Sequence, residues 1–298
     1  MGELHVGTSG YAYKGWKGSF YPEKLPDKEM LTFYAGQFST VEINYSFYQM
    51  PKERVLEQWA GVVPEGFRFA LKANQRITHV QRLRNCESTL KRFLEVASVL
   101  EEGNHLGPIL VQLPPNFKFD APLLGEFLAL RPRAFRFAFE VRHASWYTEE
   151  TYALLRRFET ALCLAETDDF TPPDVLTAPF TYVRLRREEY SAKELSAWRK
   201  RFDAWRAAGA DVYAYVKHED AGKGPKYVRQ LIDSRGLRGG GHKSQPGGRY
   251  LAWRPKYRLA LAGRRCGLAA VLFIRLLFSR CSRRSESWAH FGTRPANF

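Results

Sequence analysis

The chain has 298 residues, which allows one large domain or two small ones, and 45% apolar content is ample for a core. Four widely spaced cysteines without a Cys-x-x-Cys pair argue against a disulfide framework or a structural zinc site, and fit a reducing, cytoplasmic location. The net charge of +15 is concentrated in residues 233–298, where 14 Lys and Arg face two acids. Residues 1–232 are therefore nearly neutral, and nucleic acid is disfavoured as their partner.

Eight strand-like runs occur in the first 216 residues, and segments with helical spacing of apolar residues separate most of them. The runs are 4–9, 40–45, 67–73, 108–113, 135–141, 162–167, 181–186 and 212–216. Repeated strand–helix alternation predicts an α/β fold of the TIM-type (β/α)8 barrel class. A doubly wound sheet is the alternative.

One connection does not fit the alternation. The segment DDFTPPDVLTAP (168–179), between the sixth and seventh strands, has two adjacent prolines and little room for a helix. We predict a loop or a single turn there, so that this helix is missing or shortened.

The composition changes near residue 233. We assign residues 1–232 to a barrel domain and residues 233–298 to a basic, Gly/Arg-rich extension outside the core, expected to be disordered or aberrant. Its apolar run GLAAVLFIRLLF (267–278) is shorter than the roughly 20 residues that span a bilayer, so no membrane span is predicted. The alternative is a basic arm that binds nucleic acid or a membrane surface.

The strands share a pattern of polar residues. Barrel strands point alternate residues inward and toward the helices; in FRFAFEVRH (135–143) the phenylalanines form one face, and Glu140 and Arg142 lie on the other. Across the strands, the polar residues toward the carboxyl-terminal end of the inward face are Glu42, Asn44, Lys72, Gln112, Glu140, Arg142, Asp168, Arg184 and Tyr215. Barrel enzymes carry their active sites at that end, so we expect these side chains to lie together, with cations pairing the carboxylates.

Five long motifs carry a family resemblance. They are GTSGYAYKGWKGSFYP (7–22), STVEINYSFYQMP (39–51), FRFALKANQRITH (67–79), GPILVQLPPNF (107–117) and FAFEVRHASW (137–146). In this order they closely resemble the signatures of the domain of unknown function 72 family, also called YecE-like. The resemblance covers residues 4 to about 232 and implies a TIM-type barrel, but no particular reaction. The chain departs from the family pattern at RLRR (184–187) and VKHEDAGKGP (216–225), which implies a different specificity if those positions contact substrate.

The polar set suggests specific roles. Paired carboxylates serve glycoside hydrolysis and proton abstraction, and a lysine beside them either forms a Schiff base or stays a protonated partner. The candidate catalytic residues are Glu42, Glu140, Lys72 and His143. The candidate substrate-binding residues are Asn44, Gln112, Arg142, Trp146, Asp168, Arg184, Tyr215 and Trp16, the arginines holding an anion and Trp146 forming a stacking wall.

We therefore expect a metal-independent enzyme of hydrolase, lyase or isomerase type that acts on a small anionic, sugar-like or phosphorylated substrate without a cofactor. Few histidines follow strand ends, and the cations of the polar set would repel a metal ion. One alternative is a nucleic-acid-processing or nucleic-acid-binding barrel that uses Trp16 and Trp146, resembles an endonuclease and carries a divalent metal. Others are a non-catalytic ligand-binding barrel, and ion pairs that serve packing alone.

Overall fold

The computed structural model describes residues 1–218 and 222–232, so the predicted extension 233–298 lies outside the described residues. The strands are β1 (Leu4–Thr8), β2 (Thr40–Ile43), β3 (Arg68–Leu71), β4 (Ile109–Gln112), β5 (Phe137–Glu140), β6 (Ala161–Glu166), β7 (Phe180–Leu185) and β8 (Asp211–Val216). The α-helices are α1 (Met30–Ala35), α2 (Tyr45–Tyr48), α3 (Glu53–Ala60), α4 (Glu87–Glu102), α5 (Ala121–Ala129), α6 (Glu149–Arg157), α7 (Ala192–Ala207) and α8 (Lys223–Ile232). Short turns of 3-10 helix span Lys14–Trp16, Asp27–Glu29 and Ala144–Trp146, and a π-helical turn spans Arg76–Val80.

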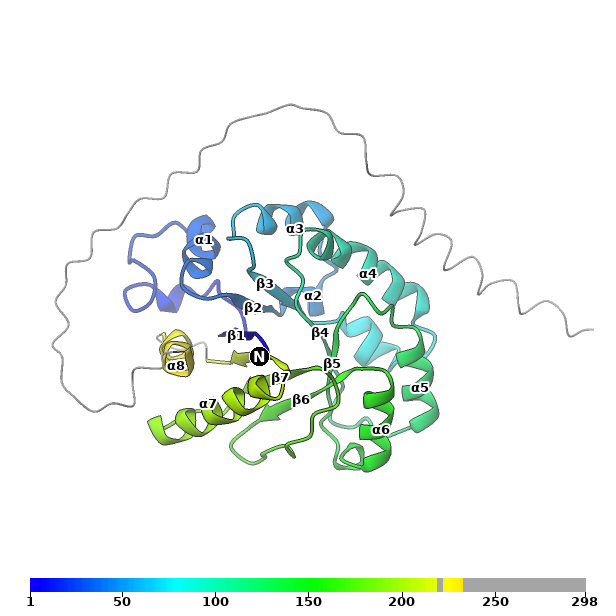
Figure 1. The fold of residues 1–298 in the computed structure, drawn as a ribbon. Helices are drawn as coiled ribbons and strands as arrows, with labels where there is room; N and C mark the ends of the chain where they lie inside the picture. The colour runs from blue at the N-terminus through cyan, green and yellow to red at the C-terminus, as the bar shows by residue number, and fades with distance from the viewer. Residues whose placement is uncertain (219–221, 233–298) are drawn as a thin grey trace, which may run out of the picture. The chain divides into compact units, whose positions relative to one another are not determined.

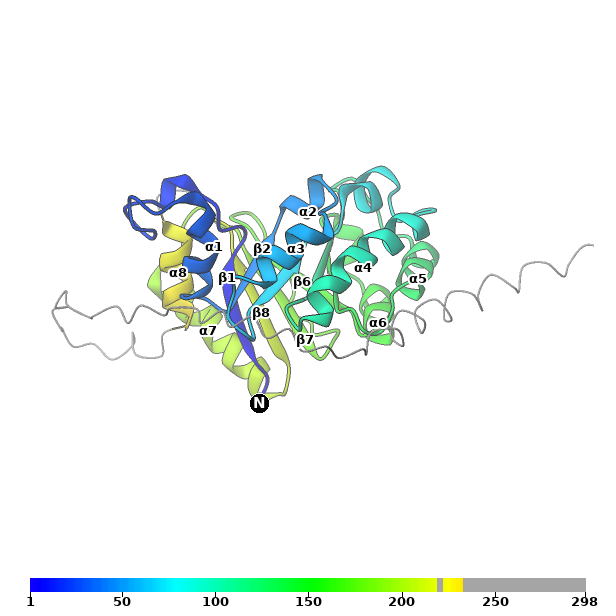
Figure 2. The ribbon, with the colours of Figure 1, turned by 90° about the horizontal axis from the view of Figure 1, so that it is seen from above.

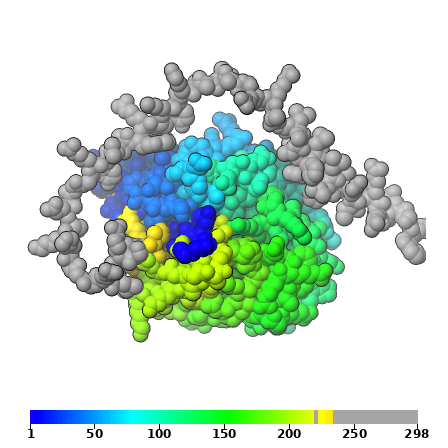
Figure 3. Space-filling view, in the orientation of Figure 1, coloured from blue at the N-terminus to red at the C-terminus, as the bar shows by residue number. Residues whose placement is uncertain are grey.

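The strands form the predicted TIM-type barrel. Six of them make a curled parallel sheet in the order β1-β8-β7-β6-β5-β4, and β2 pairs in parallel with β3. Isolated parallel bridges join the two sheets, from Ser9 to Glu42 on one side and from Lys72 to Leu110 on the other. The helices surround the strands (Figure 1), and the first residues of the chain lie at the amino-terminal end of the ring, which faces the viewer in Figure 3.

Side-chain alternation divides the apolar residues into two clusters. The strand residues that point outward pack on the helices: Phe139 lies 5.7 Å from Phe127 of α5, and Phe69 lies 5.9 Å from Trp59 of α3, measured between ring centroids. A separate cluster fills the inside of the barrel. Its buried members are Ala70, Leu110, Ala138, Ala161, Cys163, Phe180, Tyr182, Tyr213 and Tyr215. The interior is thus a packed core beneath the carboxyl-terminal mouth.

The connection between β6 and β7 contains no helix, as predicted. Proline removes a backbone donor and restricts the preceding residue to extended conformations, which disfavours a helix across residues 172–173. Among the described residues, no helix has the length and apolar character needed to cross a bilayer.

The second strand is shorter than expected. The run predicted as 40–45 ends at Ile43, and Asn44 already has helical dihedral angles (φ −83°, ψ −20°). Tyr45 therefore lies in α2 and is exposed, rather than sharing the buried face of Val41. This early turn places α2 over the carboxyl-terminal end of the barrel, opposite the amino terminus of the chain (Figure 2).

Glycine is required where β1 approaches β2. A Cβ atom at Gly7 would lie 2.0 Å from the backbone oxygen of Thr40 and 2.9 Å from the Tyr34 hydroxyl. The ring closes at this point through the Ser9–Glu42 bridge, and the backbone of β2 has little freedom to withdraw. The glycine-rich start of the chain therefore serves close strand packing.

We predict that Gly7→Ala destabilises the protein by about 1–3 kcal/mol or more, because overpacking against backbone forces the strands apart. The matched control is Gly125→Ala in α5, where a Cβ meets nothing within 4 Å. That control should stabilise the protein by about 0.5–1 kcal/mol, since alanine favours helix interiors. Urea unfolding of both variants measures the difference, and equal stability of Gly7→Ala and the parent protein would contradict this explanation.

Candidate active site

A buried arginine bridges two buried carboxylates near the carboxyl-terminal end of the barrel. Arg184 of β7 donates from Nη2 to Oε1 of Glu42 at 2.8 Å and from Nη1 to Oε2 of Glu140 at 2.6 Å. Glu42 and Glu140 belong to β2 and β5, and both are fully buried, while Arg184 is 3% exposed. We call these three residues the Arg184 bridge. It joins the two-stranded sheet to the six-stranded sheet across the barrel interior.

Neutral groups complete the hydrogen bonding of Glu42. Ser9 Oγ donates to Oε1 at 2.6 Å, and Tyr182 Oη donates to Oε2 at 2.8 Å. Burial raises the pKa of Tyr182 well above its ordinary value, and Glu42 beside it raises the pKa further, so Tyr182 remains a donor. Both oxygens of Glu42 are therefore occupied.

Cations and an amide complete the hydrogen bonding of Glu140. Its Oε1 accepts from Gln112 Nε2 at 2.9 Å, from Arg142 Nε at 2.9 Å and from Arg186 Nη1 at 3.4 Å. Burial alone raises the pKa of Glu140, but Arg184, Arg142 and Arg186 outweigh burial and hold it well below the ordinary range. Glu140 thus stays ionised, and its stabilising contribution is lost only in strong acid, when the pH falls through this lowered pKa.

Lys72 directly follows β3, and it is not paired with a carboxylate as a protonated partner of Glu42 or Glu140 would be. It is 7% exposed, and it forms no ion pair with any described acidic residue within 4.0 Å. Its Nζ lies 3.8 Å from the ring centroid of Phe47, a cation–π contact with α2. Burial lowers the pKa of Lys72 to about 8, with Arg184 as the largest charged contributor.

The remaining members of the predicted polar set have separate places. The Tyr215 hydroxyl is deep inside the barrel, 2.9 Å from Thr40 Oγ1. Asn44 is half-buried where the chain leaves β2. His143 is half-buried, and its Nδ1 accepts from the Ser145 amide at 3.2 Å at the start of a 3-10 turn.

Three residues predicted to bind substrate lie elsewhere. Trp16 is fully buried beside Phe20, and Trp146 is 1% exposed, with its Nε1 donating to the backbone oxygen of Phe117 at 2.6 Å. Neither indole offers a face for stacking, since both belong to the apolar core. Asp168 is exposed beyond the end of β6, where its carboxylate accepts from the backbone amide of Glu188 at 3.2 Å.

The error at Asp168 has a physical reason. Before Glu166 both faces of β6 are apolar, so alternation does not reveal which one points inward, and the structure puts Ala161 and Cys163 in the interior cluster. Glu166, on the opposite face, accepts from Trp198 of α7 at 2.9 Å, outside the ring. Asp168 is two residues after Glu166, so alternation puts it on the outward face with Glu166 and not on the inward face with Cys163.

The site also includes residues that were not predicted. Tyr182 and Arg186 share the phase of Arg184, and this alternation was a usable signal. Ser9 follows the glycine-rich strand and had no charge to mark it. Phe47 had no signal, because its role depends on the early turn into α2.

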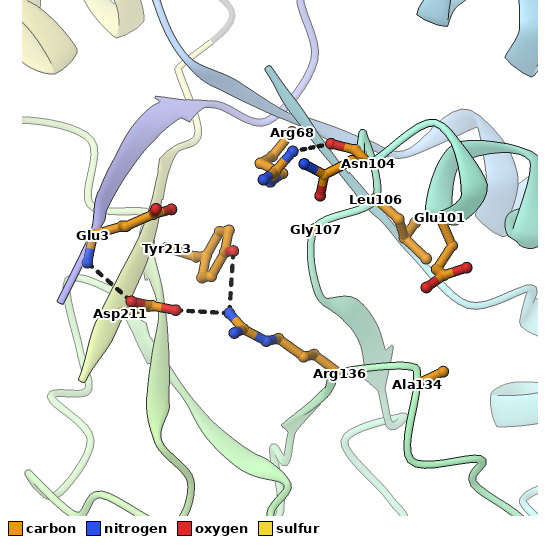
Figure 4. Close-up of a pocket in the computed structure, with 10 residues that line it drawn as sticks. All are labelled: Glu3, Arg68, Glu101, Asn104, Leu106, Gly107, Ala134, Arg136, Asp211 and Tyr213. Carbon is orange, nitrogen blue, oxygen red and sulfur yellow. Dashed lines mark hydrogen bonds and ion pairs between the residues drawn. The ribbon is translucent and has the colours of Figure 1, made fainter. Parts of the chain in front are cut away.

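A cavity of about 340 Å³ lies at the opposite, amino-terminal end of the barrel (Figure 4). Several charges that line it are already paired: Arg136 Nη1 donates to Asp211 Oδ2 at 2.8 Å and to Tyr213 Oη at 3.3 Å. In barrels this end contributes stability, whereas chemistry belongs to the carboxyl-terminal end. We therefore place the candidate site at the Arg184 bridge.

Across residues 1–218 and 222–232, no group of three or more His, Cys, Asp or Glu is arranged to hold a metal ion.

We predict that Arg184→Met destabilises the protein by about 3–5 kcal/mol, because it leaves Glu42 and Glu140 buried without compensation. Arg136→Met is the matched control. It breaks an arginine–carboxylate pair whose side chains are 47% and 21% exposed, and should cost less than about 1 kcal/mol. Chemical unfolding measures the free energy of unfolding of both variants. A similarly small decrease in both would show that the Arg184 bridge contributes little to stability.

The comparisons with known proteins agree with the fold. A DUF72 family protein of known structure from Thermotoga maritima is 25% identical, with a TM-score of 0.68 over 77% of this chain and 97% of that one. A second DUF72 structure, from Enterococcus faecalis, has a TM-score of 0.62 at 18% identity, covering 78% of this chain and 96% of that one.

Curated relatives are also similar. The UPF0759 protein YunF of Bacillus subtilis is 24% identical over 77% of this chain and 94% of its own length. The UPF0759 protein YecE of Escherichia coli K12 is 33% identical over 117 residues, a match that spans 39% of this chain and 42% of YecE. The family model described as "Protein of unknown function DUF72" matches residues 5–249, and the chain belongs to this family.

Proposed function

We propose that the protein is an enzyme that binds a small anionic, sugar-like or phosphorylated substrate at the carboxyl-terminal mouth of the barrel. The supporting observation is an excess of cations around the Arg184 bridge. Two carboxylates face four cations, and hydrogen bonds from Arg184 and neighbouring side chains already occupy the carboxylate oxygens. The four cations are Lys72, Arg142, Arg184 and Arg186.

Lys72 and Arg142 are the groups that would hold the anion. Arg142 uses Nε for Glu140, and its side chain is 31% exposed. Within the described residues its terminal nitrogens form no ion pair within 4.0 Å, so they remain available for a phosphate or carboxylate. Lys72 contributes a second positive charge, which forms no ion pair within 4.0 Å with a described acidic residue.

The two carboxylates fit a positioning role better than general acid catalysis. A general acid must carry a proton near neutral pH, and the arginines around Glu140 keep its pKa well below that range. Glu42 is enclosed by Ser9, Tyr182 and Arg184. Both glutamates would fix the orientation of Arg184.

His143 is the neutral hydrogen-bond donor that this site supports best. Its Nδ1 lies 2.9 Å from Ser145 Oγ, and that hydroxyl accepts from the Phe119 amide at 2.8 Å. The Ser145 hydroxyl proton therefore points at Nδ1, as does the Ser145 amide. With Nδ1 accepting, the neutral ring carries its hydrogen on Nε2, from which it can donate a hydrogen bond to a substrate oxygen.

The nucleic-acid alternative uses the cations of the mouth, surface bases and Trp16 and Trp146 as stacking surfaces. The burial of both indoles removes the stacking part of that alternative. An experiment can distinguish a non-catalytic ligand-binding barrel from an enzyme. A broad screen of phosphorylated and carboxylated sugars would favour the non-catalytic barrel if it finds an anion that binds but is not converted to a product.

We predict that inorganic phosphate binds the protein and that Lys72→Met weakens this binding roughly tenfold to a hundredfold, the value of a charge-assisted hydrogen bond. Affinity for phosphate should fall as the pH rises through about 8, because deprotonation of Lys72 removes its charge. The Lys72→Met variant should lack this decline. Titration calorimetry across the pH range measures both effects.

Lys52→Met serves as the control for that experiment, because Lys52 is exposed and lies outside the site. It should bind phosphate as the parent protein does. Equal affinities of Lys72→Met and Lys52→Met, or no phosphate binding in the parent protein, would count against an anion site at the mouth.

A further inference from the structure

The environment of Lys72 is suited to more than holding an anion. Its amine lies against the face of Phe47, whose ring also meets His79 at 5.0 Å. Ser46 Oγ donates to the backbone oxygen of Lys72 at 2.7 Å, which fixes α2 against β3 at this point. The lysine is therefore largely buried, with its amine against an aromatic ring, at the carboxyl-terminal end of its strand.

Burial is the main cause that favours the neutral form of Lys72; among the nearby charges, Arg184 and Arg142 favour the neutral form, whereas Glu42 and Glu140 favour the ammonium. The titratable and charged groups within electrostatic range come from β2, β5, β7 and the segment after β3; they are Glu42, Glu140, Arg142, Arg184 and His79. Glu42 and Glu140 attract the ammonium group of Lys72 less than unpaired carboxylates would, because both are ion-paired with Arg184. Desolvation and a neighbouring cation are the conditions that activate nucleophilic lysines.

We propose that Lys72 is a nucleophile that forms a Schiff base with a small aldehyde or ketone whose anionic group is held by Arg142. This inference rests on the proposed anion site and adds the substrate class, an anionic carbonyl compound. The anionic group is a phosphate or a carboxylate. The geometry behind it is a lysine that forms no ion pair with a described carboxylate and has its amine against Phe47. Arg142 lies within electrostatic range of this lysine and has available terminal nitrogens.

The chemistry balances without a further reactant. The Nζ lone pair attacks the carbonyl carbon, the C–N bond forms, and the oxygen takes up a proton to give a carbinolamine. That hydroxyl then leaves as water with a second proton, and a protonated imine remains. The amine gave up one proton and the protonated imine keeps the other, so one proton is taken up overall. The cationic imine accepts the electron pair of a C–H or C–C bond at the adjacent carbon, which gives an enamine and releases a proton or a carbonyl fragment to solvent. Reprotonation of the enamine and hydrolysis of the imine then release the product and restore the amine.

Borohydride trapping tests this step. The full chain is incubated with dihydroxyacetone phosphate, or separately with pyruvate, and reduced with sodium borohydride, which converts the imine to a stable amine. Peptide mapping then gives the label on Lys72 and, as an internal reference, on exposed Lys52. At neutral pH a lysine with a pKa of about 8 has roughly 300-fold more neutral amine than one at 10.5. Restricted access offsets part of this, so we expect at least about tenfold more label on Lys72.

The controls separate this inference from the proposed function. Lys72→Arg keeps the charge but forms no Schiff base, so it should bind inorganic phosphate and lose the specific label. Phosphate should also suppress the label in the parent protein, and the more efficient compound shows whether the anion is a phosphate or a carboxylate.

Two results would overturn parts of the account. If phosphate binds while Lys72 is labelled no more than Lys52 by either compound, the Schiff-base inference fails and the anion site stands. If phosphate neither binds nor suppresses the label, the anionic requirement fails, and with it the proposed function.

Discussion

The contact between Arg184 and the two glutamates is the constraint on which the site depends. A buried charge is costly unless it is paired and fully hydrogen-bonded, and these three charges meet that condition only together. The contact also joins β2 to β5 and β7, so it links the small sheet to the large one from inside the ring. The same side chains that close the barrel therefore set the electrostatics of its mouth.

The character of Lys72 follows from that pairing. Arg184 presents two parallel donors to two different carboxylates, and the serine, tyrosine, glutamine and arginines nearby occupy the rest of the oxygen atoms. No acidic oxygen of the described residues is left within ion-pair distance of Lys72. In our proposal, the positive, partly desolvated amine and the partly exposed Arg142 hold the anion, and the neutral amine acts as the nucleophile.

Much of this arrangement is predictable from the sequence. Alternation along FRFAFEVRH placed Glu140 inward and its phenylalanines against helices, and the same reasoning brought Lys72, Gln112 and Arg184 to one end. The closed ring and the connection without a helix after β6 also followed from pattern and proline content.

The rest depends on distances that a sequence does not contain. Alternation is uninformative in β6, where both faces are apolar up to Glu166, and it therefore misplaced Asp168. An indole shortly after a strand is equally consistent with a binding wall or with core packing, and only the bond from Trp146 to Phe117 distinguishes them. Whether Arg184 or Lys72 pairs with the glutamates is decided across the barrel, by contacts between strands far apart in the chain.

The most direct test of this account is the pKa of Lys72 itself. Nuclear magnetic resonance of the full chain with labelled lysine side chains, assigned by loss of one signal in Lys72→Arg, follows its titration without any ligand. The account predicts a midpoint near 8. A midpoint at or above the ordinary value of 10.5 would mean that a carboxylate pairs with Lys72 after all, and it would contradict the central claim.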